Sequence, residues 1–335
     1  MRPKIVKEST KEFFKLHGRE NWHKFVHGYL YLAYLDPYVK VLIRGVRLVV
    51  GAVPNAWLDT FRPVFAYVPD RYHAKVLTHE DALKIVSLKQ DIRVPREQSE
   101  KIIPFDIANQ IVIRNADAIV LMECPCRREK KNPCQPLDVC MIIGEPYASF
   151  MLEHGKSLRA RRVSREEAIA VLEGCHRRGN VHNAYFKDAM GDQFYAICNC
   201  CSCCCCGLEG QRLFDAMSLT VPIKEFASSG YLATIKGGKC TGCGLCVSRC
   251  PFMAISLPEG LEEARVNPDK CQGCSVCADL CPQDAIEFAR ATSRGIPLDV
   301  QALTKAQKPG KAVSISGTAP RKRSKGRATS SAGAN

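Results

Sequence analysis

Two stretches near the C-terminal end, KCTGCGLCVSRCPFMAI at 239–255 and KCQGCSVCADLCPQDAI at 270–286, share one pattern. In each stretch two residues separate the first three cysteines, and the fourth cysteine follows after three residues and precedes a proline. Both stretches end in Ala-Ile, and they are offset by 31 residues. The repeat predicts a separate small unit over residues 233–290, with two equivalent halves.

This cysteine spacing is typical of bacterial-type [4Fe–4S] binding, in which the fourth cysteine of each run binds the cluster of the other run. Zinc is the alternative for Cys-x2-Cys pairs, but zinc sites separate two pairs by a longer spacer. The spacing therefore predicts two [4Fe–4S] clusters. The predicted ligands are Cys240, Cys243, Cys246 and Cys281 for one cluster, and Cys271, Cys274, Cys277 and Cys250 for the other.

Small residues accompany both runs. Gly242 and Gly273 lie inside the cysteine loops, where the absence of a Cβ lets the backbone curl around a cluster and point N–H groups at sulfur. The Ala-Ile pairs at 254–255 and 285–286 are expected to keep water away from the clusters.

Twelve of the 20 cysteines lie outside this unit. Four of them occur in ECPCRREKKNPCQPLDVC at 123–140, and seven lie between residues 198 and 206. The first four are enough for one tetrahedral zinc ion or one [4Fe–4S] cluster. These four are Cys124, Cys126, Cys134 and Cys140.

The run ICNCCSCCCCG at 197–207 is too dense for one metal site. In an extended chain Cys198 and Cys200 share one face, while Cys201, Cys203 and Cys205 share the other. Two sites, or one site and spare thiols, fit this alternation better. We expect Cys198, Cys200, Cys201 and Cys203 to contribute to a further iron–sulfur cluster or a zinc ion. Free or redox-exchanging thiols are the third alternative.

Four segments together, ECPCR, CQPLDVCMIIGEP, GNVHNAYFKDAM and FYAICNCCSCCC, resemble a family of ferredoxin-like 4Fe–4S proteins of anaerobes. The resemblance covers about residues 65–300 and implies a Cys-rich domain followed by a two-cluster ferredoxin module. This chain has four consecutive cysteines at 203–206 where the family is expected to have three. The departure leaves open which of the four is spare.

Length and composition indicate about two folded domains, because the chain has 335 residues of which 46% are hydrophobic. The predicted fold class is α+β. Its predicted parts are an N-terminal helical segment at 1–64, a Cys-rich α+β domain at 65–207, a linker at 208–232, the two-cluster module at 233–290, and an extension with a disordered basic tail at 291–335.

The net charge of +14 comes from the two ends of the chain. Residues 302–335 hold eight Lys or Arg residues and no acidic residue. Such a run is usually a solvated tail, so we consider nucleic-acid binding unlikely. The start of the chain has no apolar signal region, and abundant thiols without one suggest a reducing, cytoplasmic compartment.

The apolar N-terminal segment is interrupted by Arg44 and Arg47, so it is not a clean membrane span. We expect helices broken near Pro37 and Pro54 that dock on the rest of the protein. The alternative is peripheral contact with an acidic membrane surface through residues 22–60.

Local signals place further elements. Thr78 and Ser164 resemble N-caps of two helices, residues 105–115 after Pro104 suggest another helix, and apolar or β-branched runs at 117–124, 180–186 and 193–200 predict strands. His182 lies in one of these strands, and a core histidine is favoured over a ligand or proton donor.

We therefore expect an iron–sulfur electron-transfer protein of the ferredoxin type that serves redox partner proteins. The alternative is an iron–sulfur oxidoreductase that reduces a substrate at a cluster in residues 105–207. A redox regulator that touches nucleic acid through the basic tail is less favoured. The sequence shows no dinucleotide fingerprint, phosphate-binding loop or HExxH motif, and no catalytic residue can be named.

Overall fold

The computed structural model describes residues 6–54, 57–217 and 219–306 and confirms the predicted α+β class. The α-helices are α1 (Glu8–His17), α2 (Trp22–Ala33), α3 (Leu35–Ala52), α4 (Leu58–Ala66), α5 (His79–Val86), α6 (Arg96–Ile102), α7 (Pro125–Arg128), α8 (Tyr147–His154), α9 (Arg165–Arg177), α10 (Cys206–Asp215), α11 (Leu245–Arg249), α12 (Val276–Asp279) and α13 (Val300–Ala306). The strands are β1 (Tyr72–Leu77), β2 (Ile92–Arg93), β3 (Val112–Ile113), β4 (Ile119–Glu123), β5 (Asp138–Ile143), β6 (Arg161–Arg162), β7 (Val181–Lys187), β8 (Gln193–Cys200), β9 (Phe226–Ala227), β10 (Tyr231–Ile235), β11 (Ile255–Ser256), β12 (Arg265–Val266) and β13 (Ile286–Arg290).

A seven-stranded sheet in the order β6-β4-β5-β8-β7-β1-β9 forms the centre of the body. Its pairs are antiparallel except for β1 with β9. Strands β4 and β7 are buried along their whole length, because helices cover both faces of the sheet. This explains why their sequences lack the apolar-polar alternation of a half-exposed strand.

Each face of the sheet has its own core. Helices α1, α2, α3 and α8 cover one face, where Phe13, Tyr31 and Phe150 are buried. Helices α5, α9 and α13 cover the other face, around Ile85, Leu172 and Leu303. Successive residues of a strand alternate between these two cores.

The N-terminal helices dock on the body, which agrees with the favoured prediction. Helix α2 ends at Ala33 and α3 begins at Leu35, close to the expected break at Pro37. Further along, α3 and α4 pack against α10 through Leu58, Phe65 and Phe214 and project from the body together with it. Among the described residues, no helix is both long and apolar enough to cross a membrane.

The segment 208–232, expected as a linker, is packed structure. Most of α10 lies in it, and β9 adds a parallel strand to the edge of the main sheet. Leu208, Phe214 and Phe226 are buried, so the apolar positions of this segment serve the core rather than a flexible connection. Residues 302–306, the start of the predicted disordered tail, instead belong to α13, which packs on the main body. The rest of the predicted basic tail, residues 307–335, lies outside the described residues.

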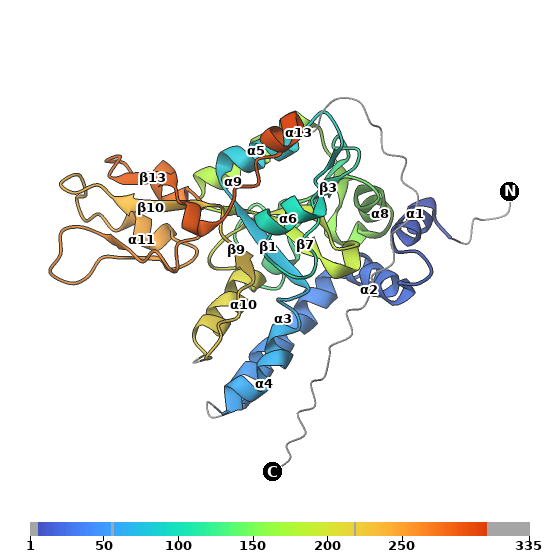
Figure 1. The fold of residues 1–335 in the computed structure, drawn as a ribbon, viewed down its shortest axis with the longest axis horizontal. Helices are drawn as coiled ribbons and strands as arrows, with labels where there is room; N and C mark the ends of the chain where they lie inside the picture. The colour runs from blue at the N-terminus through green and yellow to red at the C-terminus, as the bar shows by residue number, and fades with distance from the viewer. Residues whose placement is uncertain (1–5, 55–56, 218, 307–335) are drawn as a thin grey trace, which may run out of the picture.

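The predicted two-cluster module extends from one side of the body (Figure 1, orange). Its elements repeat: β10 pairs with β13, β11 pairs with β12, and each cysteine run ends in a short helix, α11 or α12. The buried alanines Ala254 and Ala285, from the two Ala-Ile pairs, occupy equivalent positions in the two halves. This internal symmetry follows from the sequence repeat.

Most local predictions agree with the structure. The Thr78 and Ser164 side chains accept hydrogen bonds from the backbone N–H groups of Asp81 and Glu167, as N-caps of α5 and α9. Residues 193–200 form β8 as expected.

The helix predicted at 105–115 is wrong. Only β3 forms there, and Ala108 has a left-handed backbone with a φ of 55°. Its apolar residues are drawn into the core and into pairing with β2, which overrides their local helical pattern.

Candidate metal centres

The two cysteine runs of the module line two separate small cavities. One cavity is lined by Cys240, Cys243, Cys246 and Cys281. The other is lined by Cys250, Cys271, Cys274 and Cys277. The structure thus brings the fourth cysteine of each run next to the first three cysteines of the other run. Four thiols around one cavity are the donor set that a [4Fe–4S] cluster needs, one for each iron.

Backbone groups around these cavities point to sulfur. The N–H of Ala254 lies 3.2 Å from Cys250 Sγ, and the N–H of Ala285 lies 3.4 Å from Cys281 Sγ. In the loops, Gly242 and Gly273 have φ values of +63° and +67°. These left-handed turns favour glycine and let the chain wrap around the cavity. The arrangement fits an iron–sulfur cluster, whose potential depends on such N–H donors.

The two cavities differ in their distance from the body. Cys271, Cys274 and Cys277 are buried, whereas Cys243 is exposed. Cys274 belongs to the same continuous hydrophobic core as the Cys-rich domain. We call the cavity around Cys271 the proximal site and the cavity around Cys243 the distal site.

The proximal site is joined to the body by side-chain contacts. Phe252, which lines the proximal site, packs on Phe226 of β9 with ring centroids 5.6 Å apart. The Arg249 side chain donates to the Arg178 carbonyl at 3.2 Å. Asp279 of α12 is 3.0 Å from His176 of α9. The proximal site therefore faces the Cys-rich domain.

The remaining thiols divide into two groups in the Cys-rich domain. The first, here the inner thiol group, gathers sulfurs from β4, α7, β5, β8 and the start of α10 around one cavity. Its members are Cys124, Cys126, Cys140, Cys198, Cys200, Cys205 and Cys206; Cys201 also lines the cavity but lies with the second group. The second, here the loop thiol group, has four sulfurs that all lie within 4.8 Å of one another. Its members are Cys134, Cys201, Cys203 and Cys204.

This division differs from the sequence-based grouping. Cys134 lies 2.9 Å from Cys203, sulfur to sulfur, and not with Cys124, Cys126 and Cys140. Cys205 joins Cys200 rather than Cys201 and Cys203. The cause is the backbone: β8 ends at Cys200, a turn follows, and α10 begins at Cys206. The alternation of an extended strand therefore stops before the end of the run.

Hydrogen bonds between thiols bind the inner group together. The Cys126 and Cys140 thiols donate to Cys124, which holds the pKa of Cys124 well below its usual range. Hydrogen bonding with Cys126, whose single S–H is shared between Cys124 and Cys205, and with Cys200 likewise holds the pKa of Cys205 well below its usual range. Two sulfurs of the group are thus favoured as thiolates, the form that binds metal.

A buried arginine lies between the two thiol groups. Arg127 is 1% exposed, and its guanidinium reaches the carbonyl oxygens of Pro136 and, at 3.5 Å, of Cys134 and Asn199. Burial lowers its pKa, but the nearby sulfurs of Cys201 and the inner group more than offset this, so the pKa of Arg127 is raised. No carboxylate is paired with this guanidinium among the described residues. A buried cation of this kind matches a negatively charged metal centre on either side.

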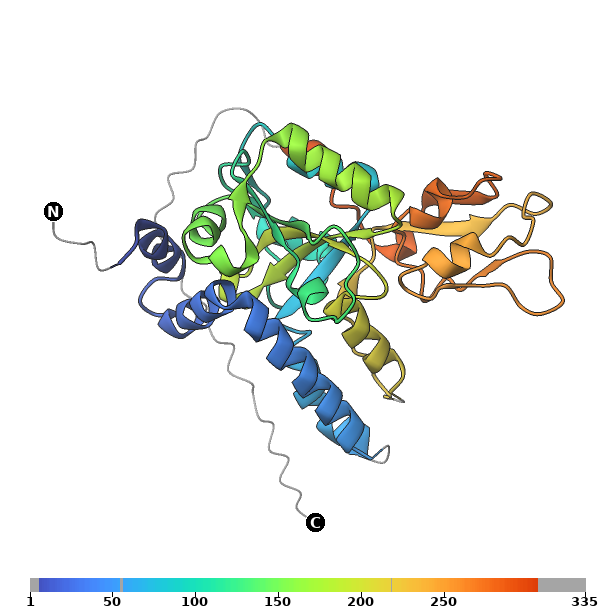
Figure 2. The ribbon, with the colours of Figure 1, turned by 180° about the vertical axis from the view of Figure 1, so that it is seen from behind.

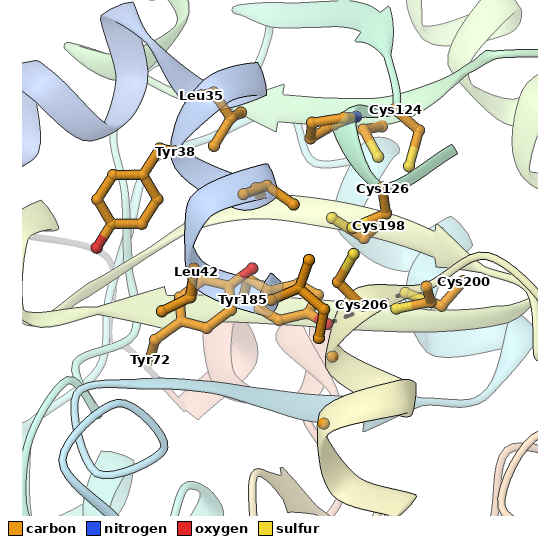
Figure 3. A pocket seen from close by; sticks show the side chains of 18 of the residues that line it. Leu35, Tyr38, Leu42, Tyr72, Cys124, Cys126, Tyr185, Cys198, Cys200 and Cys206 are labelled. Atoms are coloured by element: carbon orange, nitrogen blue, oxygen red, sulfur yellow. Dashed lines mark hydrogen bonds between the residues drawn. The ribbon is translucent and has the colours of Figure 1, made fainter. Parts of the chain in front are cut away.

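The cavity beside the inner thiol group is about 110 Å³, far larger than one water molecule requires. Figure 3 shows sulfur atoms of Cys124, Cys126 and Cys198 on one side of it, and Tyr72 with Leu42 on the other. Tyr185 lies between them and stacks on Tyr72, with ring centroids 5.0 Å apart.

Glu225 also lines this cavity. Burial, followed by the nearby Cys205 and Cys206, raises the pKa of Glu225 well above its usual range, which favours the protonated form of its carboxyl group. The cavity therefore has thiols and a carboxyl group of raised pKa in one largely apolar space.

Both thiol groups fit soft metal centres. All 20 cysteines are free, although several sulfurs approach one another closely. Neither group contains a histidine, and thiolates without harder ligands favour iron–sulfur or zinc sites. Seven inner thiols exceed the four that one cluster needs.

Sequence reasoning missed several of these residues. It did not select Cys204, Cys205 or Cys206, because the turn before α10 was not recognised. Arg127 carried no signal beyond its place between Cys126 and Cys134. Cys175 is buried but belongs to neither group.

Residues 239–285 match the 4Fe-4S dicluster domain family. The match confirms the resemblance to dicluster ferredoxin-type proteins over this part of the chain, and it assigns [4Fe–4S] binding to the module. A ferredoxin-type domain serves redox partners in general. No curated protein sequence matches the chain.

Proposed function

We propose that this protein is an iron–sulfur electron-transfer protein with two [4Fe–4S] clusters in the module and at least one further cluster in the Cys-rich domain. The distal site uses Cys240, Cys243, Cys246 and Cys281, and the proximal site uses Cys250, Cys271, Cys274 and Cys277. The further cluster draws its ligands from the inner thiol group. Clusters bound at these sites supply one-electron chemistry.

One observation carries this proposal: the sites form a continuous series. The distal site has an exposed cysteine, Cys243, at which a partner protein can approach. Cys274 of the proximal site shares one hydrophobic core with Cys200 and Cys205 of the inner thiol group. Phe252, which lines the proximal site, packs on Phe226 of the same core. The series supports electron entry at the module and transfer toward the body.

The ligand groups can be tested by matched cysteine variants in anaerobically purified protein. We expect Cys205→Ser to lose about four iron per chain, the content of one cluster. Cys175→Ser is the control, because this cysteine is also buried but lies in neither thiol group. In the reduced wild type, electron paramagnetic resonance should show signals broadened by interaction between neighbouring clusters. Equal iron and equal spectra in both variants would contradict the proposal.

A second function, reduction of a substrate at the further cluster, is favoured by the cavity. Its lining beyond the thiols is mostly apolar or aromatic, with Tyr72, Tyr185 and Leu42, and includes a few polar side chains such as Lys187 and Glu225. This combination is typical of a small-molecule site. The test is whether one iron of the cluster has an open coordination position. If it has, cyanide added to the reduced protein should change the resonance signal that Cys205→Ser removes and leave the module's signals unchanged. An unchanged spectrum supports electron transfer alone.

We also propose that the protein works in a reducing, cytoplasmic setting under anaerobic conditions, and that it contacts a membrane surface. Free thiols throughout the chain support the first part. The second part is supported by exposure: of sixteen exposed large hydrophobic side chains among the described residues, eleven lie between Trp22 and Tyr67. Leu48 and Val41, on α3, are 73% and 72% exposed.

A further inference from the structure

Three histidines lie together on the face of the main sheet opposite to the inner thiol group. His79 begins α5, His176 lies near the end of α9, and His182 is in β7. One ring nitrogen of each lies within 4.8 Å of the others. His176 and His182 are buried and His79 is half-buried. We propose that these three side chains bind one divalent transition-metal ion of the zinc class, separate from the iron–sulfur centres.

In two of the three rings, one nitrogen is hydrogen-bonded to an oxygen atom of another side chain. His182 Nδ1 lies 2.5 Å from Asn199 Oδ1, and His176 Nε2 lies 3.0 Å from Asp279 Oδ2. Metal-binding histidines almost always donate their second N–H to a carboxylate or carbonyl oxygen in this way. The remaining nitrogen of His176, Nδ1, is buried and has no hydrogen-bond partner in the described part of the chain. A metal ion would satisfy it.

The spacing of the inner nitrogens also suits a metal. His182 Nε2 and His79 Nδ1 are 3.1 Å apart. Two nitrogens bonded to a tetrahedral zinc ion at 2.0–2.1 Å are about 3.3 Å apart. The rings of His79 and His176 are stacked, with centroids 4.1 Å apart and planes at 11°. Because a nitrogen lone pair lies in its ring plane, the half-buried His79 ring turns out of this stack when the ion binds.

The charge state and ligand type agree with this assignment. Two of the rings are buried and the third is half-buried, and burial favours the neutral imidazole, which is the form that binds metal. Imidazole ligands without thiolate suit zinc and its neighbours in the first transition row. Three protein ligands leave the fourth position to water. Asp279 belongs to α12 of the module, so the site also ties the module to the body.

The test uses the full-length chain, purified anaerobically with its iron–sulfur centres and titrated with Zn²⁺. We expect His79→Gln to bind one zinc ion fewer than the wild type and to keep the same iron content, which shows that the fold and clusters persist. Asp279→Asn should weaken zinc binding about 10- to 100-fold, as loss of an orienting carboxylate does. His23→Gln, at an exposed histidine, is the control and should match the wild type.

X-ray absorption at the zinc edge of the wild type tests the site without any variant. The proposal predicts nitrogen and oxygen neighbours at about 2.0–2.1 Å. A shell of sulfur neighbours at about 2.3 Å would place the zinc on thiols instead and overturn the proposal. Equal zinc contents in His79→Gln and wild type would overturn it as well.

Discussion

Replacing Gly273 by alanine tests how closely the proximal cysteine loop approaches the chain at residues 229–231, where β10 begins. Gly273 has a φ of +67°, and a Cβ there would collide with the carbonyl oxygen of Tyr231 and with Ser229 Oγ. It would also lie 2.8 Å from the carbonyl carbon of Tyr231. Two of these three atoms belong to the backbone, so moving them aside costs more free energy than rotating a flexible side chain. The left-handed conformation costs about 1–2 kcal/mol and the overpacking about 1–3 kcal/mol, so we expect a destabilisation of about 2–5 kcal/mol in total.

Gly244→Ala is the matched control. Gly244 lies in the distal cysteine loop with a similar φ of +72°, but a Cβ there would meet nothing within 4 Å. This variant should lose only about 1–2 kcal/mol from the backbone. The assay is anaerobic thermal unfolding followed by circular dichroism, together with iron content. Gly273→Ala should melt at lower temperature and lose iron first. Equal melting temperatures for the two variants would refute the close approach.

Three further predictions concern charge and exposure. Burial lowers the pKa of His73 to about 4 in the folded protein, whereas a histidine of the unfolded chain takes up its proton near pH 6.5. Between these pH values the unfolded chain binds more protons, so the free energy of unfolding falls as the pH falls from 6.5 to 4, by up to about 3 kcal/mol. Melting curves recorded at several pH values should show that His73→Phe loses less stability toward acid than the wild type. The same dependence of stability on pH in both proteins would count against this prediction. Arg127→Met should lower the reduction potential of the further cluster in a redox titration, because a buried positive charge is removed. Arg128→Met, at the half-exposed neighbour, should leave this potential unchanged. Equal potentials in the two variants would exclude the electrostatic role of Arg127. Leu48→Glu should reduce the fraction of protein that sediments with anionic vesicles, whereas Leu261→Glu, at an exposed leucine of the module, should not. Equal sedimentation of the two variants would argue against the membrane contact.

The sequence predicts the module better than it predicts the Cys-rich domain. In the module each cysteine run is short, and its spacing determines which thiols surround which cavity. In the Cys-rich domain, the partners of Cys134 come from a run 67 to 70 residues further on, at Cys201, Cys203 and Cys204. That pairing depends on strand order and on a turn, neither of which spacing encodes.

Elements with strong local signals were predictable, and those shaped by tertiary contacts were not. Thr78 and Ser164 cap helices through hydrogen bonds to residues three positions away. In contrast, residues 105–115 have a helical pattern but form no helix, because their apolar side chains are needed in a core made by distant strands. The histidine site likewise depends on tertiary contacts, since His79 and His176 are far apart in sequence.

The most direct measurement is the iron and acid-labile sulfide content of anaerobically purified wild type. Two clusters in the module and at least one in the Cys-rich domain predict about twelve or more iron per chain, with sulfide in equal amount. About eight iron would show that the module alone carries clusters, and a colourless protein without sulfide would contradict the account entirely.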